Sequence, residues 1–280
     1  MCYYNGKKTF NGKGGTRVKM ETLGQTLDCG QSFRWKQVPG GAWEGVARGR
    51  YVRITRESLP AVLGDRFWAE YFDTGLDYGA IRAGFCAADP VLAEAVRFAP
   101  DIRILNQDPF EALCSFLLSQ CNNIGRIKGL VARLCGAFGG PADDGVHRAF
   151  PTAEALARAG EEGLRALGCG FRAAYLAEAA RCAAEGRIDW GALRRLPLDE
   201  ARSRLTELPG VGPKVADCVL LYGLHRLDAF PMDVWMKRAM KTLFPGRSPA
   251  EFGPYAGVAQ QYLFHYSRCH PELFREKAAG

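Results

Sequence analysis

The side chain with the most distinctive chemistry in this chain is Lys214, which stands at the start of an apolar helical run. A cation is disfavoured there because the N-terminal end of a helix carries a partial positive charge. The same field, combined with partial burial, favours a neutral and nucleophilic amine. Two interpretations stay open at this point: a lysine whose stem snorkels to solvent, and a lysine that attacks an electrophilic carbon.

A second candidate, Asp233, follows Pro231 and precedes another helical pattern. An acid in that position is typical of an N-cap, because its carboxylate accepts hydrogen bonds from the first free N–H groups of the helix. The sequence therefore predicts a cap at Asp233, whatever else its carboxylate does.

The elements that must position Lys214 are two helices joined by a glycine-rich hairpin, the run LPGVG at residues 208–212. Gly210 and Gly212 suit a backbone that needs a positive φ or a close approach. Pro213 suits the first position of the second helix, where its missing N–H is not needed. Free N–H groups at such a hairpin, together with the helix dipole, form a site for phosphate that is independent of base sequence.

A second helix pair is predicted on either side of residues 121–123. The first helix opens with Asp108, Pro109 and Glu111 in a capping-box pattern. The second ends at Gly139 and Gly140, and its spacing predicts an inward face. That face consists of Ile124, Ile127, Val131, Leu134 and Phe138. Asparagines in a helix–helix joint are most often turn residues, and this interpretation stays open for Asn122 and Asn123.

Residues 25–55 carry the alternation of β-strands, with a short hairpin predicted at Gly49 and Arg50. Residues 56–100 give mixed helical signals. Residues 153–207 are rich in Ala and Leu with interspersed charges, which predicts further amphipathic helices. The apolar run at 219–222 predicts a buried helix.

Composition narrows the class of protein. The chain has 280 residues, 48% of them hydrophobic and 24% charged, which is ordinary for a globular protein with a substantial core. The net charge of +7 suits a polyanionic partner such as nucleic acid. No apolar run reaches the length of a membrane span, and no signal-peptide core stands at the start.

The ten cysteines contain no C-x-x-C pair, so we expect reduced thiols in an intracellular protein of the cytoplasm or nucleoid, or of the nucleus in a eukaryote. The first twenty residues contain no acid and five basic side chains, which predicts a basic arm over residues 1–22.

Five blocks, in order, carry a resemblance to a known family. They are GQSFRW at 30–35, NNIGRI at 122–127, GFRA at 170–173, LPGVGPKVADC at 208–218 with PMDV at 231–234, and GPYAG at 253–257 leading to Gln260 and Phe264. Together they resemble the helix–hairpin–helix DNA glycosylase superfamily, and within it the 8-oxoguanine DNA glycosylases. The resemblance spans roughly residues 23–268.

The resemblance implies an α+β fold, in which a twisted antiparallel β-sheet domain precedes an all-helical region. We expect the sheet domain with its helices over 23–100, the helical glycosylase region over 101–270 with the helix–hairpin–helix at about 200–225, and a tail over 271–280.

By the same resemblance, Lys214 is the nucleophile that forms a Schiff base, and Asp233 stabilises charge on the sugar. The implied base pocket consists of Gly30, Cys218, Gln260 and Phe264. Gly30 offers its carbonyl to N7–H of the oxidised base. Guanine has a lone pair at that atom, so one fixed acceptor distinguishes the two bases.

The implied DNA-binding residues bind the phosphates, contact the orphaned cytosine and fill the space that the extruded nucleotide leaves in the base stack. They are Cys121, Asn122, Asn123, Arg126, Phe171, Arg172, Gly210, Gly212, Val215 and Trp235. Two of them depart from the family: Cys121 replaces an asparagine, and Trp235 replaces a frequent histidine. A thiol cannot bind the orphan base as an amide does, so either the preference for cytosine is relaxed or Cys121 is a site introduced for cross-linking to DNA.

The predicted function is excision of 8-oxoguanine from duplex DNA, opposite cytosine, by a bifunctional glycosylase and lyase. We expect a monomer that needs no cofactor or metal. Only Cys269 lies where related enzymes hold an iron–sulfur cluster, so none is expected. Two alternatives stay open: a glycosylase for alkylated or formamidopyrimidine bases, and a DNA-binding protein without catalysis.

Overall fold

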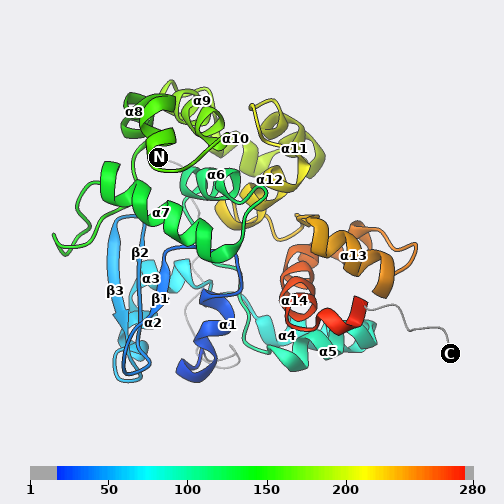
Figure 1. Ribbon diagram of the computed structural model, residues 1–280. Coiled ribbons are helices and arrows are strands. Elements are labelled where there is room, and N and C mark those ends of the chain that lie inside the picture. The colour runs from blue at the N-terminus through cyan, green and yellow to red at the C-terminus, as the bar shows by residue number, and fades with distance from the viewer. Residues whose placement is uncertain (1–17, 275–280) are drawn as a thin grey trace.

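The N-terminal part of the chain forms a small antiparallel sheet. The computed structural model describes residues 18–274, so most of the predicted basic arm (1–22) and of the tail (271–280) lies outside the described residues. The strands are β1 (Trp35–Gln37), β2 (Trp43–Ala47) and β3 (Arg50–Ile54), paired in that order (Figure 1). Trp35 pairs with Gly45, and Val46 with Tyr51.

The hairpin between β2 and β3 turns one residue earlier than predicted. Arg48 and Gly49, with φ values of 47° and 79°, are its two central residues, and Arg50 already belongs to β3. Two consecutive positive φ angles match the right-handed twist of the flanking strands. The turn therefore lies at Arg48 and Gly49, and the prediction of Gly49 and Arg50 was wrong by one position.

One face of the sheet packs on short helices through an aromatic cluster. These helices are α1 (Leu23–Leu27), α2 (Leu59–Gly64) and α3 (Arg66–Tyr71). The indole of Trp35 is buried and donates to the hydroxyl of Tyr71 at 3.0 Å. Gly45 makes room for that indole, since a Cβ there would lie 2.4 Å from the ring.

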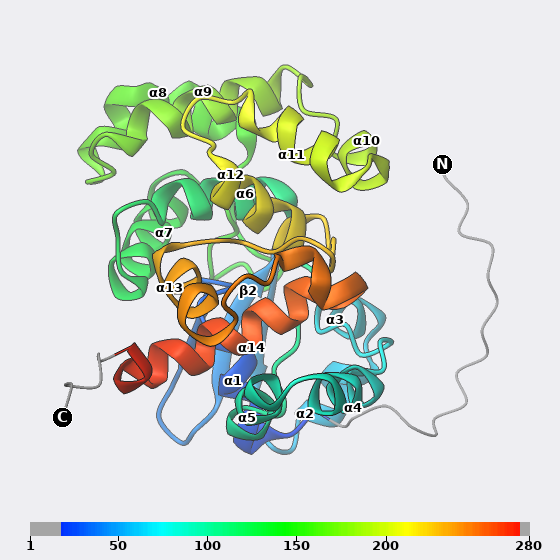
Figure 2. The ribbon, with the colours of Figure 1, turned by 90° about the vertical axis from the view of Figure 1, so that its right-hand side faces the viewer.

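Helix α4 (Tyr78–Ala88) packs on α5 (Pro90–Phe98), and α5 packs on α14 (Ala256–Cys269) near the other end of the chain (Figures 1 and 2). Phe85 of α4 also reaches Tyr262 of α14, at 6.4 Å between ring centres. The apolar side chains of α4 and α5 belong to the large helical core, whereas the sheet has a core of its own. Residues 23–100 thus contribute to both cores.

The helical region is centred on α6 (Pro109–Leu118), whose side chains are buried from Phe110 to Leu118. Asp108 caps it, accepting from Glu111 N–H at 2.9 Å. The side chain of Glu111 is buried and does not accept from the backbone N–H of Asp108, so only one of the two hydrogen bonds of the predicted capping box forms. After the joint, α7 (Ile124–Phe138) runs to Gly139, as predicted.

Helices α8 to α11 form a layer above α6 (Figure 2). They are α8 (Ala153–Ala166), α9 (Arg172–Ala184), α10 (Trp190–Arg195) and α11 (Leu198–Thr206). The hairpin then leads into α12 (Pro213–Cys218), which continues as a π-helical turn over Val219–Gly223. The apolar helix predicted at residues 219–222 is therefore buried, but it is a π-helical turn and not an α-helix.

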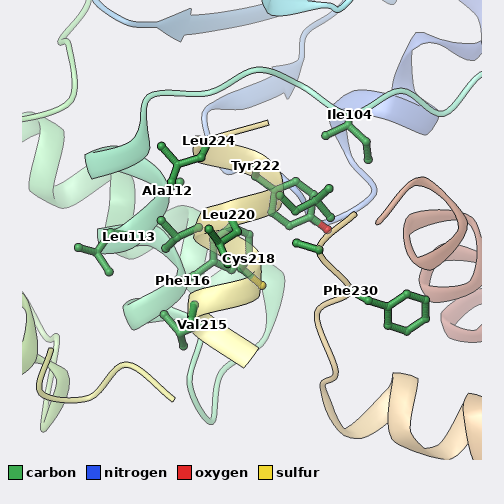
Figure 3. Close-up of a cluster of buried hydrophobic side chains, with 14 of the residues drawn as sticks. Ile104, Ala112, Leu113, Phe116, Val215, Cys218, Leu220, Tyr222, Leu224 and Phe230 are labelled. Atoms are coloured by element: carbon green, nitrogen blue, oxygen red, sulfur yellow. The ribbon is translucent and has the colours of Figure 1, made fainter. Parts of the chain in front are cut away.

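The α12 segment packs closely on α6 (Figure 3). A Cβ at Gly223 would lie 2.8 Å from the backbone of Pro109, so this contact requires glycine. The chain ends with α13 (Val234–Leu243) and α14, with 3₁₀ turns at Met20–Thr22, Pro249–Tyr255 and Pro271–Phe274. The predicted α+β class, with the sheet first and the helices after it, is confirmed.

Candidate active site

Lys214 stands in the first turn of α12, after the N-cap Gly212 and Pro213. Its Nζ atom donates to the hydroxyl of Ser119 at 2.9 Å and lies 5.0 Å from the centre of the Phe116 ring. Ser119 in turn donates to the carbonyl of Phe116 at 2.7 Å. Since its single proton is used there, Ser119 can only accept from the lysine, which fixes one N–H direction of the amine.

Asp233 is the N-cap of α13, as its sequence context predicts. Its Oδ1 accepts from Met236 N–H at 2.7 Å. The other carboxylate oxygen has no hydrogen-bond partner in the described part of the chain. The cap therefore occupies half of the carboxylate and leaves the other half available.

Lys214 and Asp233 line one cavity of about 390 Å³. It also contains all four predicted base-pocket residues and three of the predicted DNA-binding residues, namely Gly30, Cys218, Gln260, Phe264, Asn122, Asn123 and Trp235. The fold thus brings together segments near residues 30, 120, 214, 233 and 260. A larger cavity of about 600 Å³ lies among α9, α10 and α11 and contains no predicted site residue.

The walls of the cavity are largely apolar. Cys218 is buried, and burial raises the pKa of its thiol to about 12, so it stays protonated and acts as a small apolar surface. Gly30 has φ +93°, and a Cβ there would lie 3.2 Å from both Phe264 and Ile124. Any side chain at residue 30 would fill the space beside the Phe264 ring.

Two unpaired acceptors line these walls. The side chain of Gln260 is buried; its amide nitrogen donates to the carbonyl of Pro231 at 3.2 Å, and its amide oxygen has no partner among residues 18–274. The carbonyl of Gly30 accepts no hydrogen bond from the described residues. A buried acceptor is normally paired, so the free amide oxygen of Gln260 indicates a polar ligand, and the carbonyl of the partly exposed Gly30 offers a second free acceptor at the same cavity.

The joint between α6 and α7 carries several of the predicted DNA-binding residues. Asn123 caps α7, accepting from Arg126 N–H at 2.9 Å, and Asn122 donates to the carbonyl of Leu118 at 3.1 Å. The side chain of Arg126 is exposed. Cys121 is exposed and has φ +48°, a conformation that asparagine adopts far more readily than cysteine.

Arg172 lies beneath this joint and not at its surface. It is buried, and its guanidinium donates to the carbonyls of Gln120 and Cys121, the latter at 3.1 Å. It therefore holds the backbone of the joint that follows α6. The adjacent Phe171 is half exposed, with its ring against the guanidinium of Arg172 at 4.3 Å and near Tyr175.

The hairpin between α11 and α12 is held in place by the side chains of Tyr175 and Gln120. Gly210 has φ +79°, and a Cβ there would lie 2.3 Å from the Tyr175 ring. Its carbonyl accepts from the side chain of Gln120 at 3.1 Å. The N–H groups of Gly210, Gly212 and Val215 donate to no carbonyl of the described residues. These three amides are therefore available to an external acceptor, as the sequence predicts for a phosphate-binding hairpin.

Several cavity residues were not predicted from the sequence. The cavity is also lined by Ser119, Phe116 and Tyr222. Gln261 lies next to this lining, and its Oε1 accepts a hydrogen bond from the Tyr222 hydroxyl at 2.6 Å. The apolar run at 219–222 predicted only that Tyr222 is buried, and Phe116 was not singled out from the sequence. A serine just before the joint, and a second glutamine beside Gln260, were the available signals.

The remaining predicted contact, Trp235, is partly exposed and packs near Phe274 at 6.2 Å between ring centres. Across residues 18–274 no cluster of histidine, cysteine or acidic side chains has the arrangement of a metal site. In the same range no helix is long and apolar enough to span a bilayer.

Two family models match the chain side by side. The model described as the N-terminal domain of 8-oxoguanine DNA glycosylase matches residues 17–113. The model described as the HhH-GPD superfamily of base excision DNA repair proteins matches residues 114–251. The second contains the hairpin, Lys214 and Asp233; the first contains Gly30.

Individual relatives of the chain support the same family as the two models. The N-glycosylase/DNA lyase of Arabidopsis thaliana is 31% identical over 87% of this chain and 76% of its own. That of Saccharomyces cerevisiae is 45% identical over 50% of this chain and 41% of its own. The 8-oxoguanine glycosylase/lyase of Clostridium acetobutylicum, solved with DNA containing cytosine opposite 8-oxoguanine, has 33% identity and a TM-score of 0.79 over 91% and 94% of the two chains. The chain therefore belongs to the 8-oxoguanine DNA glycosylases of the helix–hairpin–helix superfamily.

Proposed function

We propose that this protein is a base-excision repair enzyme that removes 8-oxoguanine from double-stranded DNA and can nick the strand at the resulting site. One observation carries the proposal. A nucleophile held at a helix start, Lys214, lines the same cavity as two unpaired acceptors, the buried amide oxygen of Gln260 and the carbonyl of the partly exposed Gly30. The relatives named as glycosylases and lyases support both activities.

The target nucleotide must leave the duplex to reach this cavity, as for other enzymes that act on a base. The amine of Lys214 then forms a bond to C1′ through its lone pair, while the bond from C1′ to the base breaks and the base leaves with the electron pair. The proton lost by the nitrogen balances the one taken up by the departing base. Opening of the sugar ring at O4′ gives the Schiff base.

Strand cleavage follows from the same intermediate. Loss of a proton from C2′ is accompanied by cleavage of the C3′–O3′ bond, so the 3′ phosphate leaves. Water then releases Lys214 from the imine. No oxidant, metal or cofactor enters this sequence, and we propose that none is required.

Asp233 serves this chemistry through its charge. Positive charge develops on the sugar as the base departs, and a fixed carboxylate at the cavity wall stabilises it. Capping α13 through Oδ1 holds the carboxylate in place before the substrate arrives. Its two roles, cap and electrostatic stabiliser, are therefore compatible.

Base recognition combines an apolar slot with a few polar contacts. We propose that the purine lies between Cys218 and Phe264, with Gln260 on its Watson–Crick edge and the carbonyl of Gly30 facing N7–H. Guanine would place its N7 lone pair against that carbonyl and leave both groups buried and unpaired, which is strongly unfavourable.

The DNA itself is held by residues around the mouth of the cavity. We propose that the amides of Gly210, Gly212 and Val215 bind a phosphate near the lesion, with Trp235 beside them. Asn122, Asn123 and Arg126 then enter the gap and contact the orphaned base, and Phe171 wedges the stack. Because Arg172 already binds the carbonyls of Gln120 and Cys121, it holds the joint from beneath.

Borohydride trapping on duplexes that contain 8-oxoguanine tests the proposal. Wild-type protein should give a covalent adduct with DNA, and Lys214→Gln should give none while still binding the lesion. Lys241→Gln, an exposed change on α13, is the matched control and should trap like wild type. A wild-type protein that binds DNA without trapping would be a DNA-binding protein only, and one that releases alkylated bases in preference would have the other specificity.

A further inference from the structure

Three consecutive carbonyl groups beside the cavity have different surroundings. The carbonyl of Cys29 accepts from the side chain of Gln261 at 3.3 Å, and that of Gln31 accepts from the side chain of Gln107 at 2.7 Å. The carbonyl of Gly30, between them, receives no hydrogen bond from the rest of the described chain. Because the carbonyls on both sides are held by hydrogen bonds, the orientation of the Gly30 carbonyl between them is also fixed.

Both of these glutamines contact one residue, Tyr222. Its hydroxyl donates to Gln261 Oε1 at 2.6 Å, and its carbonyl accepts from Gln107 N–H at 2.9 Å. Tyr222 belongs to the π-helical turn that continues the helix of Lys214, and its ring stacks on Phe116 at 5.2 Å between centres. Figure 3 shows the Tyr222 hydroxyl directed away from α6. π-Helical turns of this kind occur frequently at functional sites.

The network is buried, and the hydrogen bonds within it restrict its motion. Gln261, Gln107 and Tyr222 are all buried, and both ends of the Gln261 amide are used. Hydrogen bonds in a low-dielectric interior strengthen one another, and a fully paired network fixes a single geometry. It joins the strand-proximal loop of Gly30, the segment before α6, the helix of Lys214 and α14.

We propose that Tyr222, Gln261 and Gln107 are positioning residues that hold the Gly30 carbonyl rigid, and that this rigidity sets the preference for bases with a hydrogen on N7. The inference rests on the proposed function. A loosely held carbonyl could turn away from the N7 lone pair of guanine or lose its contact with N7–H, and either movement reduces the difference between the two bases. The nucleophile does not depend on this network for its own hydrogen bond, which goes to Ser119.

Two variants with two substrates test the inference. Tyr222→Phe removes one oxygen and keeps the ring stacked on Phe116, and Gln261→Met removes both amide contacts at similar length. Single-turnover release of 8-oxoguanine should fall about ten-fold in each, as expected for loss of a buried hydrogen bond. Cleavage of a preformed abasic duplex, which needs Lys214 but no base pocket, should stay within about two-fold of wild type and also reports correct folding.

Tyr262→Phe is the matched control. Its hydroxyl is equally buried and donates to the carbonyl of Ile102 at 3.2 Å, away from the cavity. It should leave the ratio of lesion release to abasic cleavage unchanged. Equal losses on both substrates for Tyr222→Phe and Gln261→Met, or no loss on either, would overturn the inference while wild-type release of 8-oxoguanine stands. No release by wild type would contradict the proposed function and this inference together.

Discussion

Polar side chains around the cavity differ in whether the fold has already satisfied them. The guanidinium of Arg172 donates to the backbone carbonyls of Gln120 and Cys121, which makes it part of the scaffold. The amide oxygen of Gln260 and the carbonyl of Gly30 are unpaired, which makes them ready for a substrate. The sequence identified all three residues as site residues. It could not show which of them already have hydrogen-bond partners within the fold, because those partners lie in segments far away in the chain.

Asp233→Asn separates the two roles of the aspartate. Asparagine caps a helix as well as aspartate does, so α13 should persist. Loss of the charge should slow 8-oxoguanine release by about 10²–10³-fold with little change in lesion binding. Single-turnover rates and equilibrium binding measure the two effects. Asp189→Asn, at the equivalent cap of α10, is the control, and equal losses in rate and binding at residue 233 would make Asp233 a cap only.

Cys121→Asn should improve both stability and selectivity. The left-handed conformation of Cys121 is unfavourable for cysteine and tolerated by asparagine, so the free energy of unfolding should rise by about 1 kcal/mol. The new amide can also bind an orphaned cytosine. Urea unfolding, and excision from four duplexes that differ in the base opposite the lesion, check the two effects. Cys86→Ser, in the regular helix α4, should change neither, and an unchanged base preference in Cys121→Asn would remove residue 121 from orphan-base recognition.

At the scale of elements, local signals were sufficient where a helix begins or ends. Asp108 and Pro109 predicted the start of α6, and Gly139 the end of α7, because caps and breakers act on their own backbone. The π-helical turn after Cys218 was not predicted, since an apolar run has the same composition in either helix. The hydrogen bond between Tyr222 and Gln261 was equally invisible, because it joins two elements through tertiary packing.

The hairpin between α11 and α12 should depend on Gly210. Alanine there would adopt φ +79° and would also place its Cβ 2.3 Å from the Tyr175 ring. We expect a loss of about 1–3 kcal/mol in the free energy of unfolding, together with weaker DNA binding as the hairpin shifts. Urea unfolding and binding at several salt concentrations measure this. Gly212→Ala, with φ −87° and open space around its Cβ, should unfold like wild type; equal effects of the two changes would contradict this account.

On the scale of the whole molecule, the cavity exists only because the chain returns to it several times. Gly30 comes from the loop before the sheet, Lys214 from α12 and Gln260 from α14. The sequence predicted these members through family resemblance, whereas spacing alone could not have assembled them. It also could not show that α5 packs on α14, since an amphipathic helix does not encode its partner.

Stability should depend on pH through Glu111, a buried carboxylic acid. Burial raises its pKa to about 7 from 4.5, so the folded protein binds one more proton than the unfolded chain between these values. The free energy of unfolding therefore falls as pH rises from about 4.5 to 7, by up to about 3 kcal/mol, and then stays level with respect to this group.

Glu111→Gln should remove that slope. The variant should match wild type near pH 4.5 and exceed it at pH 8, because glutamine carries no charge to bury. Urea unfolding at several pH values compares the two proteins. Glu200→Gln, an exposed change on α11, is the control and should follow the wild-type curve. Parallel curves for wild type and Glu111→Gln would show that Glu111 does not titrate in this window.

The central claim is that the amine of Lys214 bonds to C1′ of the lesion nucleotide. Mass spectrometry of the wild-type adduct, after borohydride reduction and digestion of protein and DNA, tests it most directly. The account predicts a reduced deoxyribose remnant on the peptide that contains Lys214, with no modification of Lys237 or Lys241. A remnant on any other residue, or release of 8-oxoguanine without an adduct, would contradict it.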